Sequence, residues 1–208
     1  MKWSMIGPAS LLVAHACASS PPVRDDDMSA AQHRQMVERE EASAATEARA
    51  SEQSPGGSHQ NRAEDDPKEE HRRRAEELRE HARQHAASAA FLERFEDKSC
   101  AGIPASGRAA CPLLGPLVRL DDIPGGVRAT FVDPSRARTA IPQMRCHYAF
   151  ARARHFEEAV GCPLYVRGIE IRPGLDPREA EIVAHDPETI RLIRERSRTQ
   201  AIVVHQDR

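Results

Sequence analysis

The feature that most constrains the fold is a tripeptide that occurs twice, Cys-Pro-Leu at residues 111–113 and again at 162–164. Each copy is followed by an apolar run, a turn, a second apolar run and an Asp-Pro pair that opens a helical pattern. The tripeptides are 51 residues apart and the pairs, Asp133-Pro134 and Asp186-Pro187, are 53 apart, a difference that a turn can absorb. Residues 100–208 are therefore interpreted as one strand–strand–helix (ββα) unit present in duplicate.

Two such units give the C-terminal domain an α+β fold class. Strands joined by short turns pair antiparallel, so we expect a four-stranded antiparallel sheet with two helices on one face, a small two-layer domain. Pro142 is expected either to kink the first helix or to restart it. The expected strands are residues 117–120, 127–132, 165–171 and 179–184, with helices at 143–156 and 187–199 and a terminal strand at 201–204.

Long helices precede this domain. Residues 28–52 have high helix propensity but a thin apolar stripe, so this helix is expected to be isolated or to fray. Ser, Pro and Gly at residues 51–63 predict a flexible linker. Residues 66–99 begin with a capping pattern at Asp66-Pro67 and carry the Ala- and Leu-rich stripe of a charged amphipathic helix. Its C-terminal end either docks against the domain, or the helix forms a coiled coil with a partner or with itself.

The N-terminus has the marks of an export signal. Residues 1–17 combine a positive start, an apolar stretch too short to span a bilayer and small residues at the exit. Ala14-His15-Ala16 fits a peptidase site, and in the alternative Cys17 becomes a lipid-modified first residue. Leu11 to Ser20 resembles a bacterial lipoprotein signal, which implies lipidation of Cys17. Residues 18–65 would then be a tether, in part disordered, that contains the marginal helix and the linker.

Export places the remaining cysteines in an oxidising compartment. There are four, an even number typical of two disulfides: Cys100, Cys111, Cys146 and Cys162. Three connectivities are possible, and we favour Cys100–Cys111 with Cys146–Cys162 because each closes a short loop. A small core in a chain with 4% aromatic residues needs such stabilisation.

A metal site is the alternative use of these residues. Cys146, His147 and Cys162 offer two thiolates and an imidazole, a donor set that suits copper or zinc. Adjacent helical residues point about 100° apart, however, which makes it difficult for both to reach one ion. His81 and His85, four residues apart on one helix, are further candidate ligands. The chain has no Cys-x-x-Cys motif, which disfavours a thiol oxidoreductase.

The chain has no recognisable catalytic motif, and a net charge of −2 with few aromatic residues disfavours nucleic-acid binding. It resembles the exported or lipid-anchored proteins of bacterial envelopes. We therefore expect a non-enzymatic protein of the cell envelope without a cofactor, held to the membrane by its N-terminal lipid and facing the periplasm, or secreted. Its expected partner is another envelope protein or a cell-wall component, and the oligomeric state is left open. The competing hypothesis is a periplasmic metal-binding or metal-sensing protein that uses Cys146, His147 and Cys162.

Overall fold

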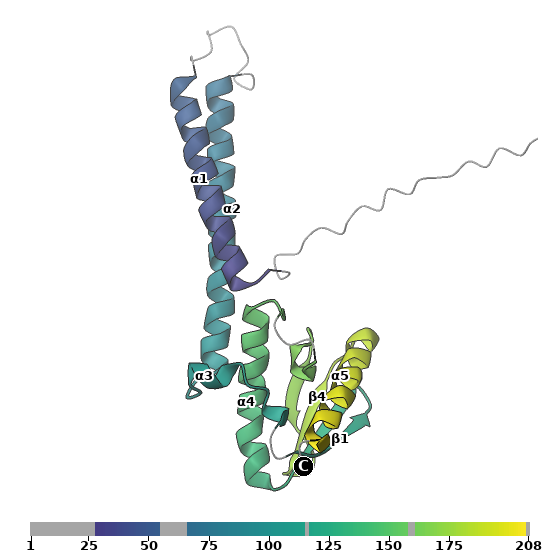
Figure 1. The fold of residues 1–208 in the computed structure, drawn as a ribbon. Coiled ribbons are helices and arrows are strands. Elements are labelled where there is room, and N and C mark those ends of the chain that lie inside the picture. The colour runs from purple at the N-terminus through teal and green to yellow at the C-terminus, as the bar shows by residue number, and fades with distance from the viewer. Residues whose placement is uncertain (1–27, 55–65, 115–116, 158–160, 207–208) are drawn as a thin grey trace, which may run out of the picture.

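The computed structural model describes residues 28–54, 66–114, 117–157 and 161–206, with side chains described as far as residue 200. The expected export signal with Cys17, residues 18–27 and residues 55–65 of the expected linker lie outside these ranges. The described chain is a mixture of helices and sheet: two long N-terminal helices are followed by a domain with four antiparallel strands (Figure 1). Within these ranges no helix combines the length and the apolar character that crossing a membrane requires.

The two N-terminal helices are α1 (Ala30–Gln53) and α2 (Pro67–Ser99), which lie side by side and antiparallel as a hairpin (Figure 1). Ser29 begins α1 with a capping box, in which its hydroxyl accepts from the Gln32 amide while the Gln32 side chain accepts from the Ser29 amide. Asp66 caps α2 by accepting from the Lys68 amide, 3.0 Å away. The expected pair of long helices is thus confirmed.

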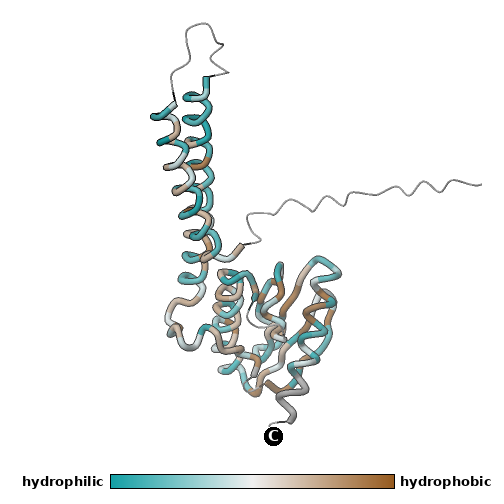
Figure 2. Tube along the Cα trace, turned by 45° about the horizontal axis from the view of Figure 1, so that its top comes forward, coloured by the Kyte–Doolittle hydropathy of each residue, from teal (hydrophilic) through white to brown (hydrophobic). Residues whose placement is uncertain are grey.

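The expectation that the first helix stands alone or frays is wrong, because α1 packs along the length of α2. The interface consists largely of small side chains, and these include the buried residues Ala44, Ala75, Ala82 and Ala89. Alanines let two helix backbones approach closely, so a thin apolar stripe is enough to form the hairpin. Figure 2 shows that the hairpin is mostly hydrophilic and that the apolar segments are concentrated in the C-terminal domain.

The hairpin is joined to the domain through the end of α2. The last turns of α2 pack against α4 (Pro134–Ala153), so α2 docks as in the first of the two alternatives. Glu96 is buried at this contact. It pairs with Arg154, at the C-terminal end of α4, at 2.8 Å, and with Arg108 of α3 (Ala105–Arg108) at 3.0 Å. Two arginines compensate the cost of burying this carboxylate.

The sheet has the strand order β1-β2-β4-β3, with every neighbouring pair antiparallel, as expected. Its strands are β1 (Leu117–Ile123), β2 (Gly126–Phe131), β3 (Glu170–Pro173) and β4 (Glu179–Val183). A short 3-10 turn precedes each strand pair, and a helix follows each pair. These elements are η3 (Pro112–Leu114) with α4, and η4 (Pro163–Tyr165) with α5 (Pro187–Gln206).

The main core lies between the sheet and the helices α4 and α5. Its fully buried members come from strands and helices alike and include Val127, Ala129, Met144, Ile182 and Ile193. Helix α4 begins at Pro134, where Asp133 accepts from two backbone amides, and continues through Pro142 without restarting. Buried side chains on both sides of this proline hold the helix in place.

Two sequence-based strand predictions are wrong. Residues 165–171 do not form one strand, because η4 and a turn occupy the first part and β3 begins only at Glu170. Tyr165, Val166 and Ile169 are buried in the core instead, so their apolar pattern reflects packing rather than pairing. Residues 201–204 do not form a terminal strand, since α5 continues to Gln206.

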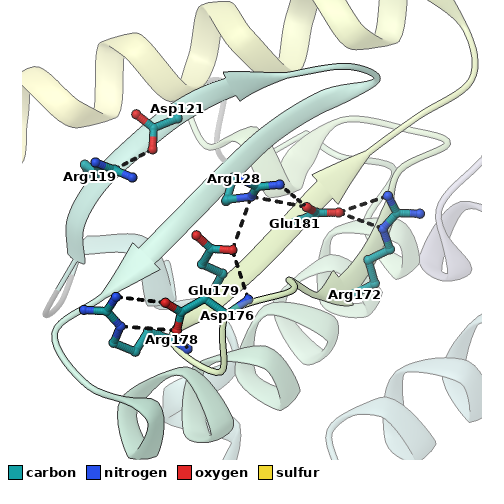
Figure 3. A network of polar contacts seen from close by, with 8 residues as sticks. All are labelled: Arg119, Asp121, Arg128, Arg172, Asp176, Arg178, Glu179 and Glu181. Carbon is teal, nitrogen blue, oxygen red and sulfur yellow. Dashed lines mark hydrogen bonds and ion pairs between the residues drawn. The ribbon is translucent and has the colours of Figure 1, made fainter.

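A row of alternating charges crosses the sheet (Figure 3). Asp121, Arg128, Glu181 and Arg172 are paired in register across β1, β2, β4 and β3. Side chains alternate along a strand, so the row lies on the face opposite the core residues Ala180 and Ile182. Glu181 accepts a hydrogen bond from Arg128 at 2.8 Å and pairs with Arg172 at 2.9 Å. These contacts lower the pKa of the Glu181 carboxyl, and the hydrogen bond from Arg128 has the largest effect.

Candidate metal centre

The cysteines pair differently from the prediction. Cys100, at the end of α2, forms a disulfide with Cys146 of α4, with Cα atoms 4.5 Å apart, so neither Cys100–Cys111 nor Cys146–Cys162 exists. The reason is tertiary: the end of α2 packs on α4 and brings together two residues 46 apart in sequence. The predicted pairing was based on the number of residues between cysteines, and that number carries no information about which helices pack together.

The other two cysteines remain thiols and meet each other. Cys111 stands immediately before η3 and Cys162 immediately before η4, and their sulfur atoms are 3.0 Å apart. Cys162 is buried and Cys111 is half-buried. The two Cys-Pro-Leu segments that organise the sequence therefore place their sulfur atoms at one point of the core.

His147 of α4 completes a group of three donors. Its side chain is 1% exposed, and its Nδ1 lies 2.9 Å from the carbonyl oxygen of Arg108. Because a carbonyl oxygen only accepts, Nδ1 carries a ring proton, and in the neutral ring the lone pair is on Nε2. That Nε2 lies 3.6 Å from the Cys162 sulfur. Fixing one ring nitrogen in this way is how proteins orient metal-binding histidines.

The donor atoms of Cys111, His147 and Cys162 all lie within 4.8 Å of one another. The predicted metal set therefore needs one correction: Cys146 is consumed by the disulfide with Cys100, and Cys111 takes its place. His81 and His85 are not part of this group, because they lie on α2 in the helical hairpin.

Gln200 of α5 is a fourth polar group at this point, and the sequence-based prediction missed it. Its Nε2 donates to the Cys111 sulfur at 3.2 Å, while its Oε1 is buried and has no hydrogen-bond partner among the described residues. The side chain is 7% exposed. A sequence signal existed: Gln200 follows His147 by 53 residues, the same interval that separates the two Asp-Pro pairs.

The two thiols, Cys111 and Cys162, differ in pKa. The hydrogen bond from the Cys162 thiol, aided by His147 and opposed by burial, lowers the pKa of Cys111 to about 5. The same hydrogen bond, followed by burial, raises the pKa of Cys162, because a second thiolate would lie against the first. Of the two, Cys111 is therefore the thiol that ionises more readily.

Comparisons of the chain with protein-family models, with curated proteins and with solved structures found no match. What this cluster can do follows from its donor atoms. Two sulfurs and an imidazole nitrogen form the donor set that selects zinc, copper(I) and similar soft or borderline ions over magnesium or calcium.

Proposed function

We propose that this protein binds one soft or borderline transition-metal ion, zinc(II) or copper(I), through Cys111, Cys162 and His147. The observation that carries the proposal is the convergence of these three donors within 4.8 Å, with His147 Nδ1 already bonded to a backbone carbonyl. A positive ion would also offset the repulsion between two adjacent thiolates, so that both cysteines could ionise side by side.

We further propose that Gln200 supplies the fourth donor and that zinc(II) is the favoured ion. Nitrogen and oxygen of a side-chain amide are exchanged by a rotation of the group, so the unpartnered Oε1 can be turned toward the sulfur pair. Zinc takes four donors in a tetrahedron, and a sulfur pair, an imidazole nitrogen and an amide oxygen meet that number.

We infer that the site lies on the axis of a duplicated ββα unit, with a sheet in one layer and two helices in the other. The pattern of contacts supports this. His147 contacts the cysteine of the second copy, Cys162, and Gln200 contacts that of the first, Cys111. The strand order β1-β2-β4-β3 is likewise unchanged when the two copies are exchanged. Both α4 and α5 contribute side chains to the same core as the sheet.

The cellular setting remains a proposal based on the sequence. We propose that the protein acts at the cell envelope, without enzymatic activity, and that lipid on Cys17 holds it to the membrane. In that setting the domain would bind or sense a metal ion in the periplasm, at the end of a helical hairpin that separates it from the tether. Binding of another envelope protein or a cell-wall component is compatible with this role.

The test is a count of thiols and of metal in the same sample. Full-length protein, exported and purified without chelator, is denatured, its thiols are titrated and its zinc and copper are measured. We expect two thiols from Cys111 and Cys162 and about one metal ion per chain from this centre, which the double variant Cys111→Ser/Cys162→Ser loses. The exposed His185, changed to alanine, serves as the control and keeps the metal. A sample with no free thiol in this pair, and with no more bound metal than the double variant, would mean a second disulfide and would refute the proposal.

A further inference from the structure

A second group of metal-binding side chains lies in the helical hairpin. His33 and Glu40 project from α1, and His81 and His85 project from α2. The sequence suggests only the two residues of α2, because their partners are about 50 residues away on the other helix. Antiparallel packing brings all four into one part of the hairpin, with His85 between His33 and Glu40.

Glu40 and His85 are the centre of this group. The Nε2 atom of His85 is 3.8 Å from Oε1 of Glu40, and the Nδ1 atom of His81 is 4.0 Å from the same oxygen. The other ring nitrogen of His85, Nδ1, lies 2.8 Å from Nδ1 of His33. Each nitrogen of the His85 ring therefore has its own neighbour, a carboxylate on one side and an imidazole on the other.

Glu40 lacks the partners that a buried carboxylate needs. Its side chain is 13% exposed, and its Oε2 atom is buried without a hydrogen-bond partner in the described part of the chain. Burying an ionised carboxylate is costly unless it is paired or coordinates a cation. The surrounding interface is built from alanines such as Ala44 and Ala82, so nothing in the packing requires a carboxylate here.

We propose that Glu40, His81 and His85 bind a divalent cation of the zinc class, and that His33 orients the ring of His85. Two histidines four residues apart share one face of a helix, and zinc sites use such a pair with a carboxylate as third ligand. Donors about 2.0–2.2 Å from zinc lie about 3.3 Å from one another in a tetrahedron. The observed 3.8 and 4.0 Å separate each histidine from the carboxylate, and gathering all three donors around one ion requires side-chain rotations, which His81, at 61% exposure, is free to make.

The proton positions on the two imidazole rings are compatible with binding of the ion by His85. When Nε2 of a neutral His85 binds the ion, its proton is on Nδ1, which then donates to the lone pair of Nδ1 in His33. Three protein ligands leave a fourth position for water. The ion joins α1 to α2, so it binds the paired hairpin and not the separated helices. Its effect is therefore to stabilise the hairpin in proportion to its concentration.

The experiment uses the full-length Cys111→Ser/Cys162→Ser variant, in which the first metal centre is absent, so the two proposals are tested separately. Zinc is titrated against a chromophoric chelator, and thermal unfolding is followed by circular dichroism with and without zinc. We expect one zinc equivalent and a rise in Tm. Adding His81→Ala or Glu40→Gln weakens zinc binding at least tenfold and removes the rise. Adding His33→Ala weakens it about 10–100-fold, as loss of an orienting partner does.

A matched control lies two to three turns away on the same helix. His71 contacts Glu47 across the hairpin at 2.6 Å, so His71→Ala removes a histidine–carboxylate pair without touching the proposed site. It should leave zinc affinity unchanged. His81 is exposed enough for its replacement to leave the helices folded, which circular dichroism without zinc confirms. Absence of zinc binding in the Cys111→Ser/Cys162→Ser background, or equal losses for His71→Ala and His81→Ala, would overturn the proposal.

Discussion

At His147, a backbone carbonyl decides which ring nitrogen is available to a metal ion. The Nδ1 proton is bonded to the carbonyl oxygen of Arg108, and the remaining nitrogen points to Cys162. Tyr165 packs on the imidazole with ring centroids 4.8 Å apart, which restricts the ring further. A donor that is buried and already oriented loses little entropy on binding, so the proposed ion would meet a largely formed site.

The role of Gln200 gives the first prediction. Gln200→Ala removes the proposed fourth donor and should lower zinc affinity about 10–100-fold, the range found when an important neighbour of a metal site is lost. Gln200→His should tighten binding, because a second imidazole would stand at the position related to His147. Both are measured by competition with a chromophoric chelator. Equal affinities for wild type and Gln200→Ala would remove Gln200 from the site.

The metal set predicted from the sequence shares two of its three main residues with the cluster in the structure and differs in one cysteine. Cys162 and His147 were in the expected metal set, and their donor types suffice for that inference. The sequence places all four cysteines in disulfides, and its alternative metal set includes Cys146 where the structure has Cys111, because the true pairing depends on α2 packing against α4. Contacts between distant segments of this kind have no local signature. The 53-residue interval from His147 to Gln200 is the one clue in the sequence that could have completed the set.

At the scale of elements, capping residues were the most reliable signals. Asp66, Asp133 and Asp186 each accept from a backbone amide at the start of a helix, where the sequence places a helix start. Predictions based on apolar runs were less reliable. The run after Cys162 is buried as a turn and loop, and the run at 201–204 continues α5. Burial, and not strand pairing, explains the first of these runs.

Gly126 gives the second prediction, since it lies where β2 crosses closest to β4. A Cβ atom at this position would stand 2.0 Å from the carbonyl oxygen of Ile182. Gly126→Ala should therefore separate the two central strands and lower the free energy of unfolding by about 1–3 kcal/mol, measured by urea denaturation. Gly161→Ala is the control, because an added Cβ meets nothing within 4 Å there. Equal stability of the two variants would contradict the pairing of β2 with β4.

The charge row on the sheet gives the third prediction, which depends on pH. The pKa of Glu181 is lower in the folded than in the unfolded state, so its ionised form stabilises the fold above the unfolded value and this stabilisation is lost as pH falls through the folded value. Glu181→Gln should cost about 1–2 kcal/mol at pH 7 and progressively less below about pH 4. Urea unfolding at pH 7 and pH 3 measures the difference.

A control from the same domain separates burial from charge. Glu188 also pairs with an arginine, Arg191, but both side chains are more than half exposed, whereas Glu181 is 9% exposed. Glu188→Gln should leave the unfolding midpoint unchanged at both pH values. A cost for Glu181→Gln that is the same at pH 3 as at pH 7 would show that its packing, and not its charge, matters.

At the scale of the whole molecule, the protein consists of a polar helical hairpin and a compact domain that are joined at one end. The Cys100–Cys146 disulfide and the two arginines around Glu96 hold α2 to α4, so the hairpin has a fixed connection to the domain. The two proposed metal sites are in different parts: one lies where η3, η4, α4 and α5 meet, and the other lies between the helices of the hairpin. Each joins segments that are far apart in sequence.

The proposed setting gives the fourth prediction. If Cys17 carries the lipid, Cys17→Ser should release the protein from the membrane fraction into the soluble fraction of cells that produce it. Metal content should be unaffected, since Cys17 is not among the proposed ligands. Fractionation followed by immunoblotting measures the change. Continued association of Cys17→Ser with membranes would rule out the lipid anchor and leave the metal centre untouched.

The measurement that tests the central claim most directly is X-ray absorption at the zinc edge of the full-length His81→Ala variant, in which the hairpin site is disabled. A site made by Cys111, Cys162, His147 and Gln200 predicts two sulfur neighbours at about 2.3 Å and two nitrogen or oxygen neighbours at about 2.0–2.2 Å. Adding Cys111→Ser should remove one of the sulfurs. A spectrum with only nitrogen and oxygen neighbours, or one unchanged by Cys111→Ser, would contradict the account.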